Sequence, residues 1–308
     1  MPDLTPIVRN GITIDATYAE AFDMRATALV ITAPTLRWAH IAAASMTGFA
    51  TSVIACGVEA AIDAELPPET TPDGRPGLRV LLFAGSTGEL QKQLTNRVGQ
   101  CVLTSPGSAC YAGLTGTEPL KLGDGLRYFA DGFQISKRLP DRHIWRLPVM
   151  DGEFVCEATT GLTKTAVGGG NLILLGRTSQ TTLTAAEAAA AAIAATPDAI
   201  APFPGGIARS GSKIGSKYKG LIASTNHRYC PTVRAEIPDS ALGPDVGAVL
   251  ELVIDGLTPE AVAAAMRNGL AAVIALGPEA GATRIAAGNY GGKLGRHHFH
   301  LHELAPPP

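Results

Sequence analysis

The chain has 308 residues, a formal net charge of −2, 46% hydrophobic residues and 17% charged residues. The apolar content excludes an intrinsically disordered chain. The near-neutral charge argues against a nucleic-acid-binding protein, because neutralising phosphates requires a basic excess. The first residues lack the pattern of a signal peptide, and no run approaches the roughly 18 to 20 apolar residues of a membrane helix. We therefore expect a soluble, cytoplasmic protein of about two domains that binds neither nucleic acid nor membranes.

The first half of the chain alternates strand and helix signals. Helical patterns extend over Thr35–Met46, which Gly48 ends, and over Glu89–Leu103, whereas Glu69–Gly77 is dense in turn residues. Short apolar runs typical of strands occupy Ala26–Ile31, Thr51–Ala55, Leu78–Phe83 and Leu126–Phe129. The resulting order is strand, helix, strand, strand, helix, strand, which is the βαββαβ pattern of a ferredoxin-like unit.

The second half predicts the same kind of unit. One helix is expected to begin at a capping box formed by Thr184 and Glu187 and to continue through an alanine-rich run. Another follows Thr258 as N-cap and runs over Ala261–Leu276. A glycine-rich turn is expected at Gly168–Gly170. Strands are expected at Gly152–Glu157, Asn171–Leu175, Ile200–Ile207, Ala248–Ile254, Thr283–Ala287 and Phe299–Leu304. The sequence thus predicts an α+β fold of two ferredoxin-like α/β-sandwich lobes with mainly antiparallel sheets.

Three glycine-rich, polar stretches are candidates for ligand binding: Pro202–Lys219, Ala223–Thr232 and Ala287–Gly295. The first nearly imitates a phosphate-binding loop, but Ser212 follows Gly211 where that loop requires lysine, so a simple connection is an alternative. The second gathers hydroxyl, amide, imidazole and guanidinium groups, as a binding loop or a solvent-facing loop would. The third echoes the first, with two adjacent glycines followed by lysine.

Glu251 is the most informative single residue. In the strand AVLELVID it shares one face with Val249 and Val253. If that face is covered, burial raises the pKa of the Glu251 carboxyl and makes it a proton carrier near neutral pH. If the face is open, Glu251 is an ordinary solvent-facing carboxylate, and the sequence leaves both alternatives open.

The histidines and cysteines do not predict a metal site. On a terminal strand, His298, His300 and His302 would share one face, and such a set could bind zinc. No further acidic or histidine cluster completes a recognisable catalytic set, so a polar outer face is the favoured interpretation. The five cysteines are scattered, without a CxxC pair, and are expected to be reduced thiols.

Long segments of the chain are similar to those of a known family. They include the three glycine-rich stretches and also Ile12–Phe22, Thr47–Ala60, Thr71–Gly77, Arg97–Thr104 and Phe129–Phe133. From about Gly11 to Leu304 the chain resembles formylmethanofuran:tetrahydromethanopterin formyltransferase. In composition it resembles the branch of methylotrophic bacteria, whose members belong to a formyltransferase/hydrolase complex.

The resemblance implies a fold, an activity and an assembly. It implies a proximal lobe at residues 1–149, a distal lobe at residues 150–308, and a homotetramer built as a dimer of dimers. The implied reaction moves a formyl group reversibly between methanofuran and N5 of tetrahydromethanopterin, in the oxidation of formaldehyde to formate. Both carriers are substrates, no cofactor or metal is bound, and subunits resembling formylmethanofuran dehydrogenase are the implied partners. The alternative is a non-catalytic carrier-binding or scaffolding subunit of that complex.

The family's catalytic glutamate lies in a YEIVING-like strand that matches LELVIDG, which implies a catalytic role for Glu251; Leu250 replaces the usual aromatic residue before it. The tetrahedral oxyanion of formyl transfer needs hydrogen-bond donors. Loop chemistry suggests Gly205, Gly206, Ser224, Thr225 and Asn289 for this role. The carboxylates of the carriers need cations, and the candidates are Lys213, Lys217, Arg228 and Lys293.

Overall fold

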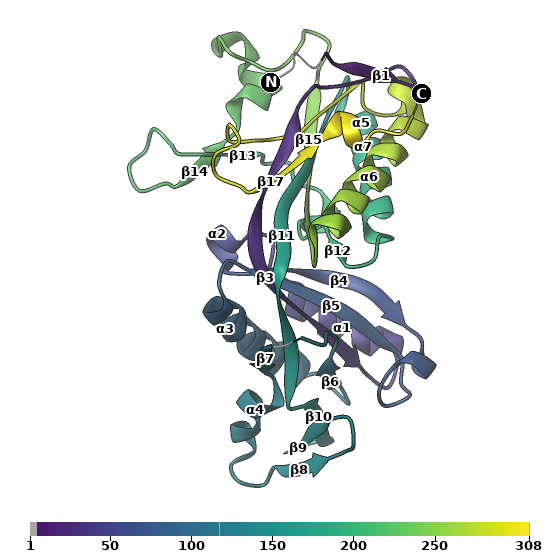
Figure 1. Ribbon diagram of the computed structural model, residues 1–308, viewed down its shortest axis with the longest axis vertical. Coiled ribbons are helices and arrows are strands. Elements are labelled where there is room, and N and C mark those ends of the chain that lie inside the picture. Colours follow the sequence, from purple (N-terminus) through teal and green to yellow (C-terminus); the bar gives the residue numbers. More distant parts are fainter. Residues whose placement is uncertain (1–4, 117, 308) are drawn as a thin grey trace. The chain divides into compact units, whose positions relative to one another are not determined.

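The computed structural model describes residues 5–116 and 118–307 (Figure 1). These residues form two compact units. Unit 1 contains the described residues up to Phe22 together with those from Gly168 onward, and unit 2 comprises Asp23–Val167. The domain boundary expected between residues 149 and 150 divides the sequence at a single point, and it stays a prediction. In space, residues 5–22 belong with the second half and residues 150–167 with the first.

Unit 2 contains a βαββαβ run. Its elements are β3 (Tyr18–Thr32, shared with unit 1), α1 (Leu36–Thr47), β4 (Glu59–Leu66), β5 (Gly77–Ala84), α3 (Thr87–Arg97) and β6 (Ala109–Ala112). The strands lie in the order β4-β5-β3-β6, and all three pairs are antiparallel. A parallel pair joins β6 to β10 (Gly152–Glu157), after which β9 (His143–Val149) and β8 (Ile135–Arg138) follow in antiparallel pairs.

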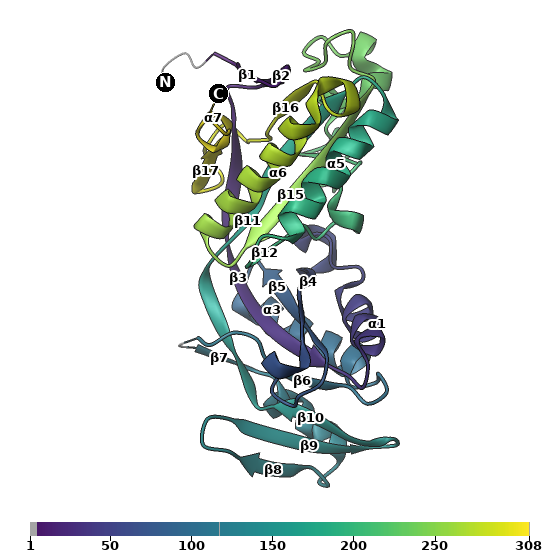
Figure 2. The same cartoon turned by 90° about the vertical axis from the view of Figure 1, so that its right-hand side faces the viewer.

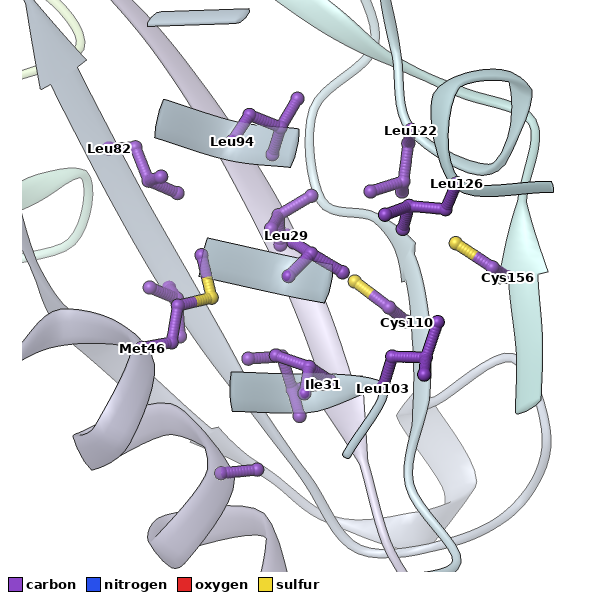
Figure 3. Close-up of a cluster of buried hydrophobic side chains, with 14 of the residues drawn as sticks. Leu29, Ile31, Met46, Leu82, Leu94, Leu103, Cys110, Leu122, Leu126 and Cys156 are labelled. Atoms are coloured by element: carbon purple, nitrogen blue, oxygen red, sulfur yellow. The ribbon is translucent and has the colours of Figure 1, made fainter. Parts of the chain in front are cut away.

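The core of unit 2 lies between the sheet and its helices. Figure 3 shows Leu29 and Ile31 of β3, Leu82 of β5 and Met46 of α1 directed into one apolar cluster. Shorter elements around this core are α2 (Val53–Cys56), β7 (Glu118–Lys121), α4 (Gly123–Leu126), the 3₁₀ turns at Pro68–Thr70 and Arg127–Ala130, and a π turn at Val98–Val102. All five cysteines are free thiols.

Unit 1 repeats the same element order. Its run is β11 (Thr159–Gly176, shared with unit 2), α5 (Ser179–Ala194), β12 (Ala199–Ile200), β15 (Ala248–Gly256), α6 (Pro259–Ala280) and β16 (Arg284–Ala286). The strands lie in the order β12-β15-β11-β16, and β12 with β15 and β11 with β16 are antiparallel pairs. Figure 2 shows α5 and α6 together over one face of these strands. The fold is therefore mixed α/β, and most strand pairs are antiparallel.

The remaining elements of unit 1 surround this sheet. They are β1 (Ile7–Arg9), β2 (Ile12–Ile14), β13 (Ser212–Ile214), β14 (Ala223–Thr225), β17 (His297–His300), α7 (Leu301–Leu304) and the 3₁₀ turns at Pro204–Gly206, His227–Tyr229 and Pro231–Glu236. β2 pairs in parallel with β16, and β17 pairs antiparallel with Tyr18–Ala21 of β3. Helix α6 is long and apolar enough to span a membrane by length and composition, but its buried residues contact α5 and β15, as in a core helix.

Several predicted elements of the first half are confirmed, and two are wrong. Thr35 caps α1 by accepting a hydrogen bond from the Trp38 amide (3.3 Å), and Gly48 ends the helix, as expected. Thr51–Ala55 is not a strand, because Ser52 caps the short helix α2 there, and the strand follows at β4. Leu126–Phe129 is helical, and the fourth strand is β6. Short apolar runs do not distinguish strands from helical turns.

In the second half, the predicted helix that corresponds to α5 begins too late. One predicted turn and the ends of two predicted strands are also wrong. Its N-cap is Thr178, so Thr184 lies inside the helix, where its hydroxyl donates to the Gln180 carbonyl (3.1 Å). Gly168–Gly170 is part of β11 rather than a turn. The strand expected at Ile200–Ile207 ends at Ile200, and the one expected at Phe299–Leu304 changes to helix α7 at Leu301.

Gly170 tests the packing of α6 on β11. A Cβ atom at this position would lie 2.4 Å from Cγ1 of the buried Val262. We expect Gly170→Ala to lower the free energy of unfolding by about 1–3 kcal/mol through overpacking. Gly88, in the first turn of α3, has no heavy atom within 4 Å of such a Cβ, so Gly88→Ala should stabilise by up to about 1 kcal/mol. Urea unfolding of both variants measures the difference, and equal midpoints would contradict this packing.

Candidate functional site

The centre of the site is Glu251, in the middle of β15. Its backbone exchanges two hydrogen bonds with Ala208, at 2.8 and 2.9 Å, which form an isolated bridge. Its side chain is half-buried, as are Val249 and Val253 on the same strand face. A small cavity of about 40 Å³ lies at this point, lined by Glu251 and by residues that include Ser210, Gly211, Asn226, Tyr229 and Cys230. The face of β15 that carries Glu251 is therefore covered.

The covering segments reduce the contact of the Glu251 carboxyl with water. Burial raises the pKa of Glu251 to about 7. Within the two described ranges of the chain, no group donates a hydrogen bond to this carboxyl and no cation pairs with it. Burial, and then the nearby Glu251 carboxylate, also raise the pKa of Tyr290. The carboxyl can therefore hold a proton at neutral pH and release it within the physiological range.

The glycines of the first loop differ in their availability. Gly205 has a φ of +62°, and the space where a Cβ would stand is open. Gly206 has a φ of +79° and packs against Ala190, and its amide already donates to the Phe203 carbonyl (2.7 Å). Among the described residues, no carbonyl accepts a hydrogen bond from the Gly205 amide, whereas the Gly206 amide is occupied by its own turn.

The two lysines of this loop lie on the β13–β14 hairpin, which stands out from unit 1 in Figure 1. Lys213 is half-buried on β13. Lys217 is exposed at the tip, with its ammonium 5.3 Å from the ring centre of Tyr218. Neither lysine lines the Glu251 cavity. Their role as carrier contacts therefore stays a prediction without a geometric link to Glu251.

Three predicted contacts of the second loop already have partners in the protein, one inside that loop and two outside it. Arg228 forms an ion pair with Asp239, with Nε 3.0 Å from Oδ2. The Ser224 hydroxyl donates to the Gly215 carbonyl (2.7 Å), and the Thr225 hydroxyl lies 3.5 Å from the Cys230 sulfur. These contacts stabilise the conformation of the loop around the cavity. In this structure the three side chains therefore hold the loop in place.

Glu20 organises the third loop, and sequence analysis missed it. Its carboxylate accepts four backbone hydrogen bonds, from the amides of Tyr290 (2.6 Å), Gly292 (2.8 Å), Leu294 (2.7 Å) and Gly295 (2.7 Å). Burial, the largest influence, opposes ionisation of this 1%-exposed side chain, but the four amides together lower its pKa to about 2. A fixed anion therefore holds the loop.

The same loop carries the predicted contacts Asn289 and Lys293. The Asn289 side chain donates to the Thr17 hydroxyl (3.1 Å) and accepts from the Gly291 amide (3.2 Å). Lys293 is exposed. Gly291 and Gly292 have φ values of +83° and +70°, and this left-handed backbone belongs to the turn whose amides point at Glu20. The signal available in the sequence was the pair of glycines, but the carboxylate that accepts a hydrogen bond from the Gly292 amide lies 272 residues away.

A larger cavity of about 550 Å³ adjoins the Glu251 cavity in unit 1. Four residues line both cavities: Ala208, Arg209, Ser210 and Leu250. The larger one also involves Gly205, which is thereby placed near the centre of the site. Sequence analysis did not single out Arg209 or Ser210, because they follow the glycines in a loop whose path the sequence does not give.

The C-terminal histidines do not form the strand face that was considered. His298 and His300 lie on β17 against the Tyr18 ring, at 4.8 and 5.1 Å between ring centres, while His302 belongs to α7. In the part of the chain that the structure describes, no three His, Cys, Asp or Glu side chains converge as metal ligands would.

Comparisons with known proteins agree along the whole chain. Residues 7–149 match the family model described as "Formylmethanofuran-tetrahydromethanopterin formyltransferase", and residues 152–304 match the model described as "FTR, proximal lobe". The chain is 56% identical to a subunit of the formyltransferase/hydrolase complex of Methylorubrum extorquens, over 97% of each chain. It is 45% identical to the formylmethanofuran–tetrahydromethanopterin formyltransferase of Methanocaldococcus jannaschii, over 96% of this chain and 98% of the relative.

Solved structures give the same result. The chain is similar to one in the crystal structure of the formyltransferase/hydrolase complex from Methylorubrum extorquens in complex with methylofuran, with a TM-score of 0.96 and 55% identity over 98% of this chain and 100% of that one. It is also similar to the formyltransferase from Methanosarcina barkeri, with a TM-score of 0.91 and 44% identity over 97% and 100% of the two chains.

These matches define an acyltransferase, an enzyme that transfers a formyl group. The chain belongs to the formylmethanofuran–tetrahydromethanopterin formyltransferase family. One expected label is corrected, because the family model calls residues 152–304 the proximal lobe, whereas that label was expected for residues 1–149.

The pKa of Glu251 predicts how stability depends on pH. In the unfolded chain this carboxyl titrates near 4.5, and in the folded chain near 7, so folding binds a proton between these values. The native protein therefore loses stability as pH rises from 4.5 to 7. Glu251→Gln cannot ionise, and its stability relative to the wild type should increase by roughly 1–3 kcal/mol between about pH 4.5 and about pH 8. Urea unfolding at both pH values measures this, and an unchanged difference would contradict a raised pKa.

Glu20 predicts the opposite dependence. Its folded pKa, about 2, lies below its unfolded value of 4.5, so its contribution is complete above pH 4.5 and is lost as pH falls toward 2. We expect Glu20→Gln to destabilise by on the order of 3 kcal/mol at about pH 7 and by much less at about pH 2.5. The exposed Glu69 provides the control, since Glu69→Gln should change stability little at either pH. A pH-independent effect of Glu20→Gln would show that the carboxylate charge does not hold the loop.

Proposed function

We propose that this enzyme moves a formyl group reversibly between methanofuran and N5 of tetrahydromethanopterin, with Glu251 as the proton carrier. The observation that carries the proposal is the raised pKa of Glu251, about 7, beside a cavity that can admit a reacting group. Relatives of 43 to 56% identity bear the name of this activity, which supports the choice of carriers. In this proposal both carriers are substrates, and the transfer requires no bound cofactor or metal.

The transfer exchanges one amide bond for another. N5 of tetrahydromethanopterin attacks the formyl carbon of formylmethanofuran and forms a tetrahedral intermediate with an oxyanion. The bond from carbon to the methanofuran nitrogen then breaks, and the departing amine gains a proton while N5 loses one. Glu251 donates the first proton in its neutral form and accepts the second as a carboxylate, so it ends in its starting state.

The oxyanion needs donors beside Glu251. Among the residues expected from the sequence, the free Gly205 amide is the one that geometry favours. Gly206, Ser224 and Thr225 already have hydrogen-bond partners in Phe203, Gly215 and Cys230, respectively. Asn289 belongs to the Glu20-organised loop. Ser210 and Asn226 line the Glu251 cavity and are the further candidates. Lys293 is exposed and has no ion-pair partner in the described part of the chain, so it can meet a carrier carboxylate, whereas Arg228 would first have to leave Asp239.

We propose the same assembly and cellular role as the bacterial relative. The relative from Methylorubrum extorquens is named as one subunit of a formyltransferase/hydrolase complex, and this supports formylmethanofuran dehydrogenase-like subunits as partners. The enzyme would then act as a cytoplasmic homotetramer, a dimer of dimers, in the oxidation of formaldehyde to formate. Each unit has the same order of elements along the chain, and its four strands lie in the same spatial order as those of the other unit. This similarity supports two ferredoxin-like lobes.

A catalytic role for Glu251 predicts a specific loss of activity. We expect Glu251→Gln to lower kcat for transfer from formyl-tetrahydromethanopterin to methanofuran at least ~100-fold, because the amide cannot carry the proton. The KM values should change little, since the substitution keeps the shape of the side chain. Steady-state kinetics of the purified variant test this, with far-ultraviolet circular dichroism as the control for folding. An active variant would remove the catalytic assignment, and a folded wild type without activity would favour the non-catalytic subunit.

A further inference from the structure

Unit 2 has a cavity of its own, of about 810 Å³, whereas the Glu251 cavity belongs to unit 1. Three segments line this unit 2 cavity: Leu103–Pro106, which follows the π turn after α3; Phe129; and Pro148–Asp151, at the turn between β9 and β10 (Figure 2). The first two lie in or at the end of stretches that are similar to the formyltransferase family. Formyl transfer at Glu251 gives these stretches no role, because none of their residues lines its cavity.

Large apolar side chains stand exposed beside the unit 2 cavity: Phe129, Phe133, Ile135 and Met150. Phe129 and Met150 line it directly, and Met150 is fully exposed at the turn between its two strands. Ile135 pairs with Arg146 in the β8–β9 ladder, so the same register, continued by two residues, places Phe133 opposite Pro148 of the cavity wall. Protruding apolar side chains around a hollow are typical of a surface that binds another protein.

The extent of this patch indicates the kind of contact it makes. At about 200 Å² for a fully exposed side chain of this size, the four side chains expose on the order of 600 Å² of apolar surface. A standard contact between two folded proteins buries about 800 Å² on each partner, whereas obligate homodimers bury more than about 1,000 Å² on each. With the cavity walls included, the patch has the size of a standard contact with one further protein.

The charges around the cavity favour a different protein over a second copy of this chain. Asp151 lines the cavity, its carboxylate accepts a hydrogen bond from the Gly107 amide (2.8 Å), and no cation pairs with it among residues 5–116 and 118–307. The arginines next to the lining segments already have acidic partners, in the pairs Arg75–Asp73, Arg127–Asp124 and Arg146–Glu153. A second copy would bring the same carboxylate and the same paired arginines, so it would leave the charge of Asp151 without a complement.

We propose that this face of unit 2 docks a different protein, which places an apolar side chain in the cavity and a lysine or arginine at Asp151. This inference rests on the proposed assembly with formylmethanofuran dehydrogenase-like subunits and adds the surface that they contact. Met150 is the expected anchor, because a fully exposed apolar side chain loses the most contact with water on docking. No residue lines both this cavity and the Glu251 cavity, so docking leaves the transfer site open.

The test uses the complex formed when this chain is co-expressed with the dehydrogenase-like subunits. Mass photometry over a dilution series of the purified complex measures Kd. We expect Met150→Glu to raise Kd at least ~10-fold, because it places a charge in an apolar contact. Asp151→Asn keeps an acceptor for the Gly107 amide but removes the charge, and it should raise Kd at least ~5-fold. The conservative variants Met150→Leu and Asp151→Glu should stay within about 2-fold.

Controls separate docking from folding and from catalysis. Ile54→Glu changes an apolar residue of α2 that is 60% exposed and does not line the cavity, and it should leave Kd unchanged. All of these variants should keep kcat/KM for formyl transfer within about 2-fold of the wild type, since none of them alters the Glu251 cavity. The molar mass of the chain purified without partners, measured by light scattering, should not change either.

The outcomes distinguish this inference from the proposed function. A wild type that transfers formyl groups but never co-purifies with these subunits would refute the proposed assembly, and this inference with it, while the activity stands. A complex that forms equally well with Met150→Glu and Asp151→Asn would keep the assembly and overturn the surface. Variants that lower the molar mass of the isolated chain and leave Kd for the partners unchanged would assign the surface to a second copy, which also overturns the inference.

Discussion

The backbone bridge between Ala208 and Glu251 is the constraint on which the site depends. Strand β12 pairs with β15 only at Ala199 and Ile200, so most of that edge of β15 has no neighbouring strand. The chain leaves the sheet after Ile200 and returns to it at Ala208 for a single pair of hydrogen bonds. Residues in between line the larger cavity, while residues after the bridge line the cavity at the Glu251 side chain. One short strand thus creates both the cavity and the buried carboxyl.

Two glutamates of unit 1 show how the surroundings assign different roles to the same side chain. Glu20 and Glu251 both lose water on folding, and burial alone would make both of them weak acids. Glu20 receives four backbone amides and becomes a permanent anion with a pKa of about 2. Glu251 receives no such donor in the described chain, and its pKa of about 7 suits proton transfer. The first carboxylate therefore fixes a loop, and the second is available for chemistry.

Local sequence signals predicted much of the fold, because caps and glycine stops act within a few residues. Thr35, Gly48 and Thr258 mark helix ends as expected. The errors lie where distant contacts decide the conformation. Gly168–Gly170 has turn chemistry, yet it continues a strand, where Gly170 lets α6 pack closely. The exchange of residues 5–22 and 150–167 between the units likewise has no local signal.

The site was predicted in its centre but not in its surroundings. The apolar neighbours Val249 and Val253 indicated that Glu251 could be buried, and the structure covers that face. Composition could not tell which polar loop residues are free: Arg228 is paired with Asp239, whereas Arg209 is unpaired within the described chain and lines both cavities. Glu20 was missed because its four partners are backbone amides about 270 residues away, and amides carry no sequence signal.

The central claim is that the Glu251 carboxyl titrates near neutral pH in the folded enzyme. The most direct measurement is a carbon-13 NMR titration of the protein labelled at the glutamate side-chain carboxyls, with Glu251→Gln used to assign the resonance. The account predicts one carboxyl that titrates near pH 7 in the wild type and is missing from the variant. If the resonance that disappears in the variant titrates near pH 4.5, the carboxyl is hydrated, and Glu251 is not the proton carrier described here.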